Sequence, residues 1–286
     1  MKALSSSPND TSRREPWRGS WLERPWGRMR VWRAGRGPVV LAVHGLGGSG
    51  RYWRGLAERV GEHFTIVAPD LAGFGASDRP DADVDRSLML ADLDAIIESH
   101  APAAPLRVVG HSLGGVLAGL WATKHRDRVV SLALASPPFP DGSAMDYRTR
   151  ADLRPSAGRR VASHVTRAIW PALAVPIGLA RGYPIEVVVD FGRQSVRARA
   201  WTMWVLWSDP ELKIELGALA ALDGQVPTLL AHARDDRTVS IRAHGEWARL
   251  LPHAERHVAD EGGHQFLLRS GFEPVTGWLA RDPGEG

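Results

Sequence analysis

The sequence predicts an α/β fold in which a mostly parallel central sheet is flanked by helices. Two short apolar, β-branched runs, at 39–43 and 106–110, are typical of buried strands, and a stretch of helical pattern follows each of them. Such alternation favours parallel strands that are joined by crossover helices. With 286 residues, of which 44% are hydrophobic, the chain is long enough to bury the core of one such domain.

The expected elements follow one another along the chain. A pair of strands spans about 21–34, before the alternating part begins. The next strands are expected at 39–44, 64–69, 106–110 and 129–135, with helices at 50–61, 86–100 and 112–125 between them. The buried run at 226–233 and the segment at 254–260 are expected to form the last two strands.

Residues 108–115 (VVGHSLGG) place a serine between two glycines directly after an apolar run. This is the pattern of a nucleophile elbow, a sharp turn from a strand into a helix that presents the serine outward. Such a turn strains the backbone at Ser112, and only residues without bulk fit at Gly110 and Gly114. The pattern therefore predicts Ser112 as a nucleophile.

A glycine-rich loop, residues 44–48 (HGLGG), follows the strand at 39–43. Such a loop supplies backbone N–H groups, and preorganised N–H donors stabilise the oxyanion that forms during acyl transfer. We expect Leu46 to supply one donor. Leu113 is expected to supply the other, because it follows the nucleophile at the start of a helix, where amides are unpaired and the helix dipole favours negative charge.

A carboxylate and a histidine follow the last two predicted strands. The turn at 234–239 (RDDRTV) offers two carboxylates, and we select Asp236 because it stands three residues after the strand and precedes an apolar residue. Asp235 is the alternative. The loop at 261–264 (EGGH) carries His264, which we expect to act as the general base.

The order Ser112, Asp236, His264, with each residue just after a predicted strand, resembles the α/β-hydrolase fold family. In that family the triad partners follow one another as serine, acid and histidine. The resemblance spans about residues 32–279 and includes the glycine-rich loop and the elbow. It also includes 70–78 (DLAGFGASD), whose leading aspartate and glycines are expected to be structural.

The resemblance implies a serine hydrolase that needs neither a cofactor nor a metal. His264 takes the proton of the Ser112 hydroxyl, while Asp236 orients the imidazole and stabilises its cation. Water then clears the acyl-enzyme, so that an ester, a thioester, a lactone or a C–C bond beside a carbonyl is cleaved. A carboxylic ester with an apolar or aromatic acyl group is the expected small-molecule substrate. Relatives that open epoxides use an aspartate nucleophile, which the serine argues against.

Two alternatives remain open. A lyase or cyclase of natural-product tailoring on the same fold would use the His–Asp pair to remove a proton and expel a leaving group. A ligand-binding or accessory protein would retain the fold without turnover. Product analysis distinguishes the serine hydrolase from these two alternatives. Hydrolysis incorporates water, elimination forms a double bond and a binding protein forms no product.

The alternating pattern breaks after residue 136. The stretch 137–216 contains helical segments and many arginines, and it falls where α/β-hydrolases commonly insert a helical cap. Trp201, Trp204 and Trp207 share one helical face, which either lines an aromatic pocket or forms the core between cap helices. The expected domains are a flexible N-terminal tail at 1–20, a core in two parts at 21–136 and 217–286, and the helical cap at 137–216.

Composition limits the chemistry and the partners. The chain has no cysteine, so neither a disulfide nor a thiolate nucleophile is possible. The formal net charge is +4, but basic and acidic residues are interleaved, so we expect no nucleic-acid partner. No metal-ligand spacing stands beside the candidate histidines, and we expect no metal. No apolar run reaches transmembrane length and residues 1–20 lack the apolar core of a signal peptide, so we expect a soluble, cytoplasmic protein.

Overall fold

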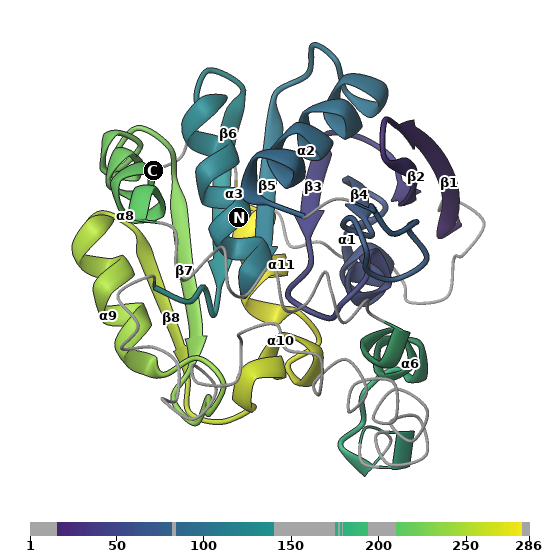
Figure 1. Cartoon of the computed structure of the whole chain (residues 1–286). Helices are drawn as coiled ribbons and strands as arrows, with labels where there is room; N and C mark the ends of the chain where they lie inside the picture. The colour runs from purple at the N-terminus through teal and green to yellow at the C-terminus, as the bar shows by residue number, and fades with distance from the viewer. Residues whose placement is uncertain are drawn as a thin grey trace.

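The computed structural model describes residues 16–81, 84–139, 175–176, 178, 180–193 and 210–281, and these form an eight-stranded sheet (Figure 1). The strand order across the sheet is β1-β2-β4-β3-β5-β6-β7-β8. The strands are β1 (Arg18–Arg24), β2 (Gly27–Gly35), β3 (Val39–Val43), β4 (Thr65–Pro69), β5 (Leu106–His111), β6 (Val129–Ala135), β7 (Thr228–Ala233) and β8 (Glu255–Ala259). From β4 across to β8 all neighbours pair in parallel, which confirms the predicted α/β class.

The first two strands form an antiparallel hairpin at one edge of the sheet. Its register pairs Arg18 with Arg33, and β2 then pairs antiparallel with β4. Strand β1 therefore begins inside the stretch 1–20 that the sequence assigns to a flexible tail. Ladder hydrogen bonds join residues 18–20 to β2, and residues 1–15 of the predicted tail lie outside the described part of the chain.

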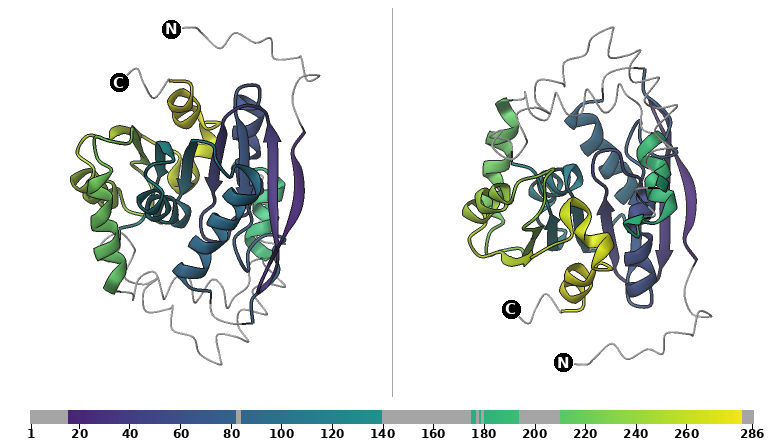
Figure 2. Two further views of the ribbon diagram at one scale, coloured as in Figure 1. Left: turned by 90° about the horizontal axis from the view of Figure 1, so that it is seen from above. Right: turned by 90° about the horizontal axis from the view of Figure 1, so that it is seen from below.

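Helices cover both faces of the sheet (Figure 2). Buried residues of α2, α3 and α9 share one hydrophobic cluster, and those of α1, α10 and α11 share another. The α-helices are α1 (Arg54–Val60), α2 (Arg86–His100), α3 (Leu113–Lys124), α6 (Ile185–Arg193), α8 (Pro210–Gly217), α9 (Ile241–Leu250), α10 (Phe266–Arg269) and α11 (Glu273–Leu279). Short 3-10 helices are η2 (Gly50–Trp53), η3 (Ala218–Ala221) and η4 (Gly263–Gln265).

Strand β3 is apolar along its whole length because both of its faces are buried. In β3, Leu41 and Val43 belong to the cluster with α2 and α3, whereas Val40 and Ala42 belong to the cluster with α1. Successive side chains of a strand point to opposite faces, so a sheet covered on both sides requires an unbroken apolar run. Polar side chains therefore gather in the loops at the carboxyl edge of the sheet.

Two described helices fall within the stretch 137–216 that the sequence assigns to a cap. Of these, α8 packs on the core, since Leu212 and Leu216 are each 1% exposed and belong to the same cluster as Leu117 of α3. The part of the predicted cap from residue 210 onward thus contributes to the core. The tryptophans expected on one cap face, Trp201, Trp204 and Trp207, lie outside the described residues.

The close approach of α3 to β3 gives the first prediction. A Cβ atom on Gly114 would lie 2.1 Å from the carbonyl oxygen of Val43, so alanine forces backbone atoms apart. We expect Gly114→Ala to lower the free energy of unfolding in urea by about 1–3 kcal/mol or more. Gly245→Ala in α9 is the control, because its Cβ meets nothing within 4 Å. That variant should be neutral or stabilising by about 0.5–1 kcal/mol. Equal stability of the two variants would contradict the tight contact.

Candidate active site

Ser112 lies on the sharp turn between β5 and α3, at the carboxyl edge of the sheet. Its backbone has φ 55° and ψ −124°, and a positive φ costs free energy for a residue with a side chain. Close backbone contact holds the turn, since a Cβ atom on Gly110 would lie 2.1 Å from the carbonyl oxygen of Gly114. The Ser112 N–H also donates to the carbonyl of Ala135 at the end of β6, at 2.8 Å. The strand ends on both sides of the turn thus fix where the hydroxyl stands.

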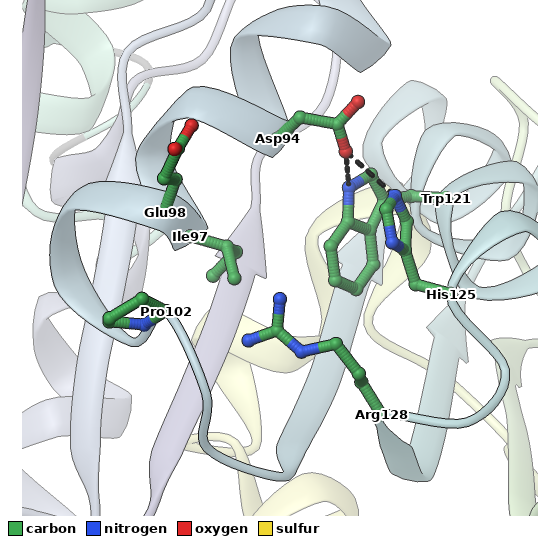
Figure 3. Close-up of a pocket in the computed structure, with 7 residues that line it drawn as sticks. All are labelled: Asp94, Ile97, Glu98, Pro102, Trp121, His125 and Arg128. Atoms are coloured by element: carbon green, nitrogen blue, oxygen red, sulfur yellow. Dashed lines mark hydrogen bonds and ion pairs between the residues drawn. The ribbon is translucent and has the colours of Figure 1, made fainter.

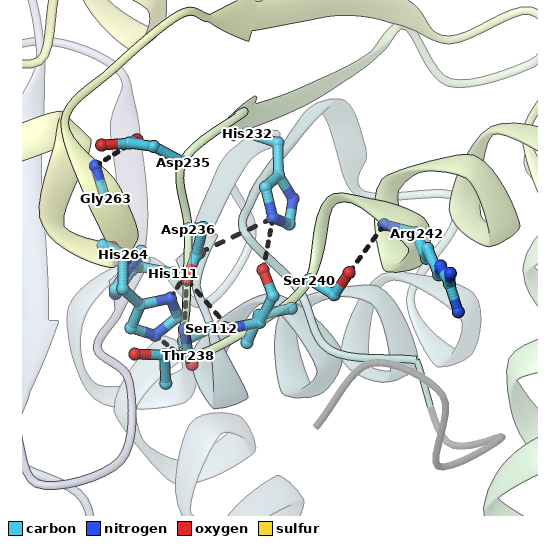
Figure 4. Close-up of polar contacts among 11 residues, drawn as sticks. His111, Ser112, His232, Asp235, Asp236, Thr238, Ser240, Arg242, Gly263 and His264 are labelled. Atoms are coloured by element: carbon cyan, nitrogen blue, oxygen red, sulfur yellow. Dashed lines mark hydrogen bonds and ion pairs between the residues drawn. The ribbon is translucent and has the colours of Figure 1, made fainter. Parts of the chain in front are cut away.

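Ser112, His264 and Asp236 form one hydrogen-bonded chain (Figure 4). Nε2 of His264 lies 3.0 Å from Oγ of Ser112, and Nδ1 of His264 lies 2.8 Å from Oδ2 of Asp236. A carboxylate only accepts, so Nδ1 carries the proton and Nε2 offers a lone pair to the serine hydroxyl. This is the arrangement that a general base requires.

The Asp236 carboxylate is buried but well supplied with donors. Its Oδ1 accepts from the N–H groups of Thr238 at 2.8 Å and Val239 at 2.9 Å. Burial alone would raise the pKa of Asp236, yet the hydrogen bond and charge of His264, together with the two amide donors, lower it overall. Asp236 therefore stays ionised at neutral pH and orients the imidazole.

The neighbouring carboxylate, Asp235, has a different set of partners. It accepts from the N–H of Gly263 at 2.7 Å and from the N–H of Gly262 at 3.3 Å. Figure 4 shows Asp235 directed toward the backbone of Gly263, while Asp236 faces the His264 ring. Of the two aspartates left open by the sequence, it is therefore Asp236 that contacts the imidazole.

The loop after β3 is held by a buried histidine. The N–H of Leu71 donates to Nε2 of His44 at 3.0 Å, so Nδ1 of His44 carries a proton and donates to the carbonyl of Gly45 at 2.7 Å. Burial lowers the pKa of His44 to about 4, which keeps the ring neutral. The Gly45 carbonyl also accepts from the N–H of Gly48 at 3.0 Å. Two donors thus fix the orientation of this one peptide group.

The orientation of the Gly45 carbonyl also sets the direction of the Leu46 N–H, which is one of the two amides expected as oxyanion donors. In a trans peptide the N–H points opposite to the C=O, so the Leu46 N–H points away from the His44 ring. Gly45 itself lies against Ser112, because a Cβ atom there would lie 2.9 Å from Cβ of Ser112. Leu113 is the first residue of α3, where an amide has no partner within the helix.

Asp70, expected to be structural, lies at the turn after β4 and is 1% exposed. Its Oδ1 accepts from the N–H of Gly50 at 2.7 Å and from Nε1–H of Trp32 at 2.9 Å, and its Oδ2 accepts from the N–H of Ala76 at 2.7 Å. Burial raises the pKa of Asp70 to about 6. The carboxylate cross-links β2, η2 and the glycine-rich turn. None of these partners belongs to Ser112, His264 or Asp236.

A buried ion pair ties α6 to the segment around η2. Asp190 of α6 is 1% exposed and accepts from the Ser49 hydroxyl at 2.6 Å and from Nε–H of Arg51 at 2.8 Å. Burial would lower the pKa of Arg51, but the hydrogen bond and charge of Asp190 raise it overall. Helix α6, which lies in the stretch predicted as a cap, is thus anchored next to the loop that carries Leu46.

Two buried histidines beside Ser112, Asp236 and His264 were not predicted from the sequence. Nε2–H of His111 donates to the carbonyl of His264 at 2.7 Å, and Nε2–H of His232 donates to the carbonyl of Val239 at 2.9 Å. Burial lowers the pKa of both rings, that of His111 to about 3. The signals available were the position of His111 directly before the elbow serine and that of His232 four residues before Asp236.

A cavity of about 280 Å³ lies at the amino edge of the parallel strands, opposite the edge where Ser112 lies (Figure 3). It adjoins the amino ends of β5 and β6, where Asp94 accepts from Nε1–H of Trp121 at 2.7 Å and lies 2.7 Å from Nε2 of His125. Arg128 donates to the carbonyls of Ala101 and Ala104, which closes the loop after α2. This cavity does not adjoin Ser112, which follows the carboxyl end of β5.

Among the residues that the structure describes, no three histidine, aspartate or glutamate side chains are grouped so that they would hold a metal ion. In the same residues, no helix combines the length and the apolar composition that crossing a membrane requires.

Comparison with known proteins identifies one family model. The model described as alpha/beta hydrolase fold matches residues 38–269. A pimeloyl-[acyl-carrier protein] methyl ester esterase from Chromobacterium violaceum is 43% identical over 110 residues, which are 37% of this chain and 40% of that protein. A 2-hydroxy-6-oxo-6-(2'-aminophenyl)hexa-2,4-dienoic acid hydrolase from Metapseudomonas resinovorans is 24% identical over 261 residues, 84% of this chain and 82% of that protein.

Solved structures agree with this fold. An esterase from Exiguobacterium antarcticum superposes with a TM-score of 0.73 at 19% identity, covering 92% of this chain and 100% of that structure. At such low identity the likeness concerns the fold alone. The chain spans 32–40% of the length of the curated relatives that match it at 36% identity or more.

The buried histidines predict loss of stability in acid. Four described histidines have a pKa below 6.5 in the folded state because of burial: His44 and His244 at about 4, His111 at about 3, and His232. The unfolded chain therefore binds more protons, and stability present above pH 6.5 is lost as the pH falls toward 4. Asp70, with its raised pKa of about 6, offsets part of this loss.

We expect the free energy of unfolding in urea to fall by roughly 1–3 kcal/mol per pH unit between pH 6.5 and 4.5. A series at pH 7.5, 6.5, 5.5 and 4.5 measures the slope. A flat profile would contradict the assignment of these rings as buried and neutral.

Proposed function

Because this chain belongs to the α/β-hydrolase fold family, we propose that it is a serine hydrolase that cleaves carboxylic esters through an acyl-enzyme. The observation that carries the proposal is the hydrogen-bonded chain from Asp236 through His264 to Ser112, which ends on a hydroxyl at a strained elbow. A serine hydroxyl becomes a nucleophile when a neighbouring base accepts its proton, and both distances suit that transfer.

In the proposed reaction, Ser112 Oγ attacks the acyl carbon while Nε2 of His264 takes the hydroxyl proton. Asp236 stabilises the resulting imidazolium and keeps Nδ1 protonated. The N–H groups of Leu46 and Leu113 donate to the oxyanion of the tetrahedral intermediate. His264 then protonates the leaving alkoxide. A water molecule, deprotonated by the same histidine, releases the carboxylic acid and restores Ser112.

An ester with an apolar or aromatic acyl group is the proposed substrate class. The esterase from C. violaceum, named for a methyl ester, supports the bond type through its 43% identity over 110 residues. Thioesters, lactones and C–C bonds beside a carbonyl pass through the same kind of tetrahedral intermediate and are the next substrates to test. The relative from M. resinovorans, named as a hydrolase of a dienoic acid, motivates the C–C substrates.

Turnover of a short-chain aryl ester tests this proposal. We expect Ser112→Ala and His264→Ala to lower kcat by about 10⁴-fold to 10⁶-fold, because each removes a group that acts in the same step. Asp236→Asn should lower kcat by about 10⁴-fold, since an amide fixes the wrong imidazole tautomer. Asp235→Asn should have a much smaller effect, because Asp235 does not contact the ring.

Folding of each variant is checked by urea unfolding, and products formed in ¹⁸O-water are analysed. Incorporation of ¹⁸O into the acid identifies hydrolysis. A new double bond without ¹⁸O would instead indicate a lyase. Absence of turnover on esters, thioesters, lactones and C–C substrates would contradict the proposed function and favour a binding protein.

The proposed oxyanion donor on the loop after β3 is tested by removing its N–H. Leu46→Pro should lower kcat by about 10²-fold to 10³-fold with little change in KM, because the donor acts on the transition state. Leu46→Ala keeps the N–H and is the matched control, so it should retain kcat within about threefold. Similar losses in both variants would mean that the side chain, and not the amide, is what matters.

A further inference from the structure

We propose that His111 and Asp235 are positioning residues that fix the backbone of His264, so that its imidazole stays in line between Ser112 and Asp236. This inference rests on the proposed function and extends it. Each of the two strand ends facing His264 supplies a pair of adjacent residues. One member of each pair, Ser112 or Asp236, is hydrogen-bonded to the imidazole, and the other is hydrogen-bonded to the backbone of the loop that carries it. The His111 ring also packs against the His264 ring, at 4.8 Å between centroids.

The loop before His264 needs such support. Gly262 has φ 127° and Gly263 has φ 62°, conformations that other residues adopt only with strain. Glycines lose more conformational freedom on folding than other residues, so a loop built on two of them is ordered only by contacts from outside. A ring displaced by 1 Å from its productive position can cost about 10²-fold in rate.

Asp235 supplies one support. Its carboxylate accepts from the N–H of Gly263 at 2.7 Å and from the N–H of Gly262 at 3.3 Å, which ties both glycines to the end of β7. Asp235 is exposed, and its neighbour Asp236 is 7% exposed. From one turn, Asp235 therefore binds the backbone of the loop that carries His264, and Asp236 binds the His264 ring.

His111 supplies the other support. Its Nε2–H donates to the carbonyl of His264 at 2.7 Å, and its ring stacks on Tyr52 at 5.0 Å between centroids with 13° between planes. The ring is 2% exposed and, because burial lowers its pKa to about 3, it is neutral and donates at neutral pH. Because His111 directly precedes Ser112, the hydrogen bond ties the base to the nucleophile through a single peptide link.

The test compares variants that remove each hydrogen bond with variants that keep it. His111→Leu removes the N–H donor, whereas His111→Gln places an amide N–H at a similar reach. Asp235→Ala removes both acceptor oxygens, and Asp235→Asn keeps one. His100→Leu is the control for loss of an imidazole, because His100 donates to the carbonyl of Ile96 at the end of α2, and Asp260→Ala is the control for loss of an exposed carboxylate.

Two readouts separate positioning from simple loss of stability. One is kcat and KM on the aryl ester. The other is the downfield ¹H resonance of the His264 Nδ1 proton in protein labelled with ¹⁵N-histidine, assigned by its absence in Asp236→Asn. We expect His111→Leu and Asp235→Ala to lower kcat by about 10-fold to 100-fold, with KM within about threefold, and to shift or broaden the resonance.

His111→Gln and Asp235→Asn should retain kcat within about fivefold of the wild type and keep the resonance, because a hydrogen-bonding group remains. The proposal is overturned if His111→Leu and Asp235→Ala keep both kcat and the resonance. It is equally overturned if the glutamine and asparagine variants lose as much as the leucine and alanine variants. Because Asp235 is exposed, its variants give a result even if His111→Leu does not fold.

The resonance does not depend on turnover, which separates this inference from the proposed function. A wild-type protein that hydrolyses nothing but loses the His264 resonance in His111→Leu and Asp235→Ala would contradict the hydrolase and support the positioning role. An active wild type whose resonance and kcat are insensitive to both changes would support the hydrolase and contradict the positioning role.

Discussion

The positive-φ backbone of Ser112 is the constraint on which the rest of the site depends. The strain persists because packing leaves the turn no other conformation: Gly114 lies against the end of β3, and the Ser112 N–H is bound by Ala135 of β6. Both strands flank β5 in the sheet, so the parallel strand order itself holds the turn. The hydroxyl consequently stands where the loops after β3, β7 and β8 converge.

Around this turn a single carboxylate is kept charged among neutral rings. Asp236 retains its charge because two backbone amides and His264 donate to it, whereas burial keeps His44 and His111 neutral. A neutral ring donates one N–H to a carbonyl without the desolvation cost of a buried cation. The buried negative charge therefore faces the ring of His232 at 3.6 Å but accepts its ring hydrogen bond from His264 at 2.8 Å, in line with the proposed role of the His264 ring as a transient cation.

The predicted bounds of helices and strands match the structure better for buried elements than for exposed ones. The strand at 129–135 and the helix at 86–100 were predicted with the bounds that the structure gives β6 and α2. Strand β1 starts earlier than predicted, because Arg18 and Ser20 are exposed and carry no apolar signal. Helix α8 carries too few apolar residues for its sequence to reveal that Leu212 and Leu216 pack on the core.

By itself the sequence determined the strand–helix order, the elbow glycines and the loops that end beside it, because these depend on local chain geometry and on apolar periodicity. Only the tertiary structure decided which of two adjacent aspartates contacts the imidazole. Successive side chains of one turn point in different directions, and the His264 ring lies on a loop 28 residues further along the chain. The hydrogen bond from His111 to His264 joins residues 153 apart. No local pattern encodes such a contact, because it exists only once β5 and β8 are placed in one sheet.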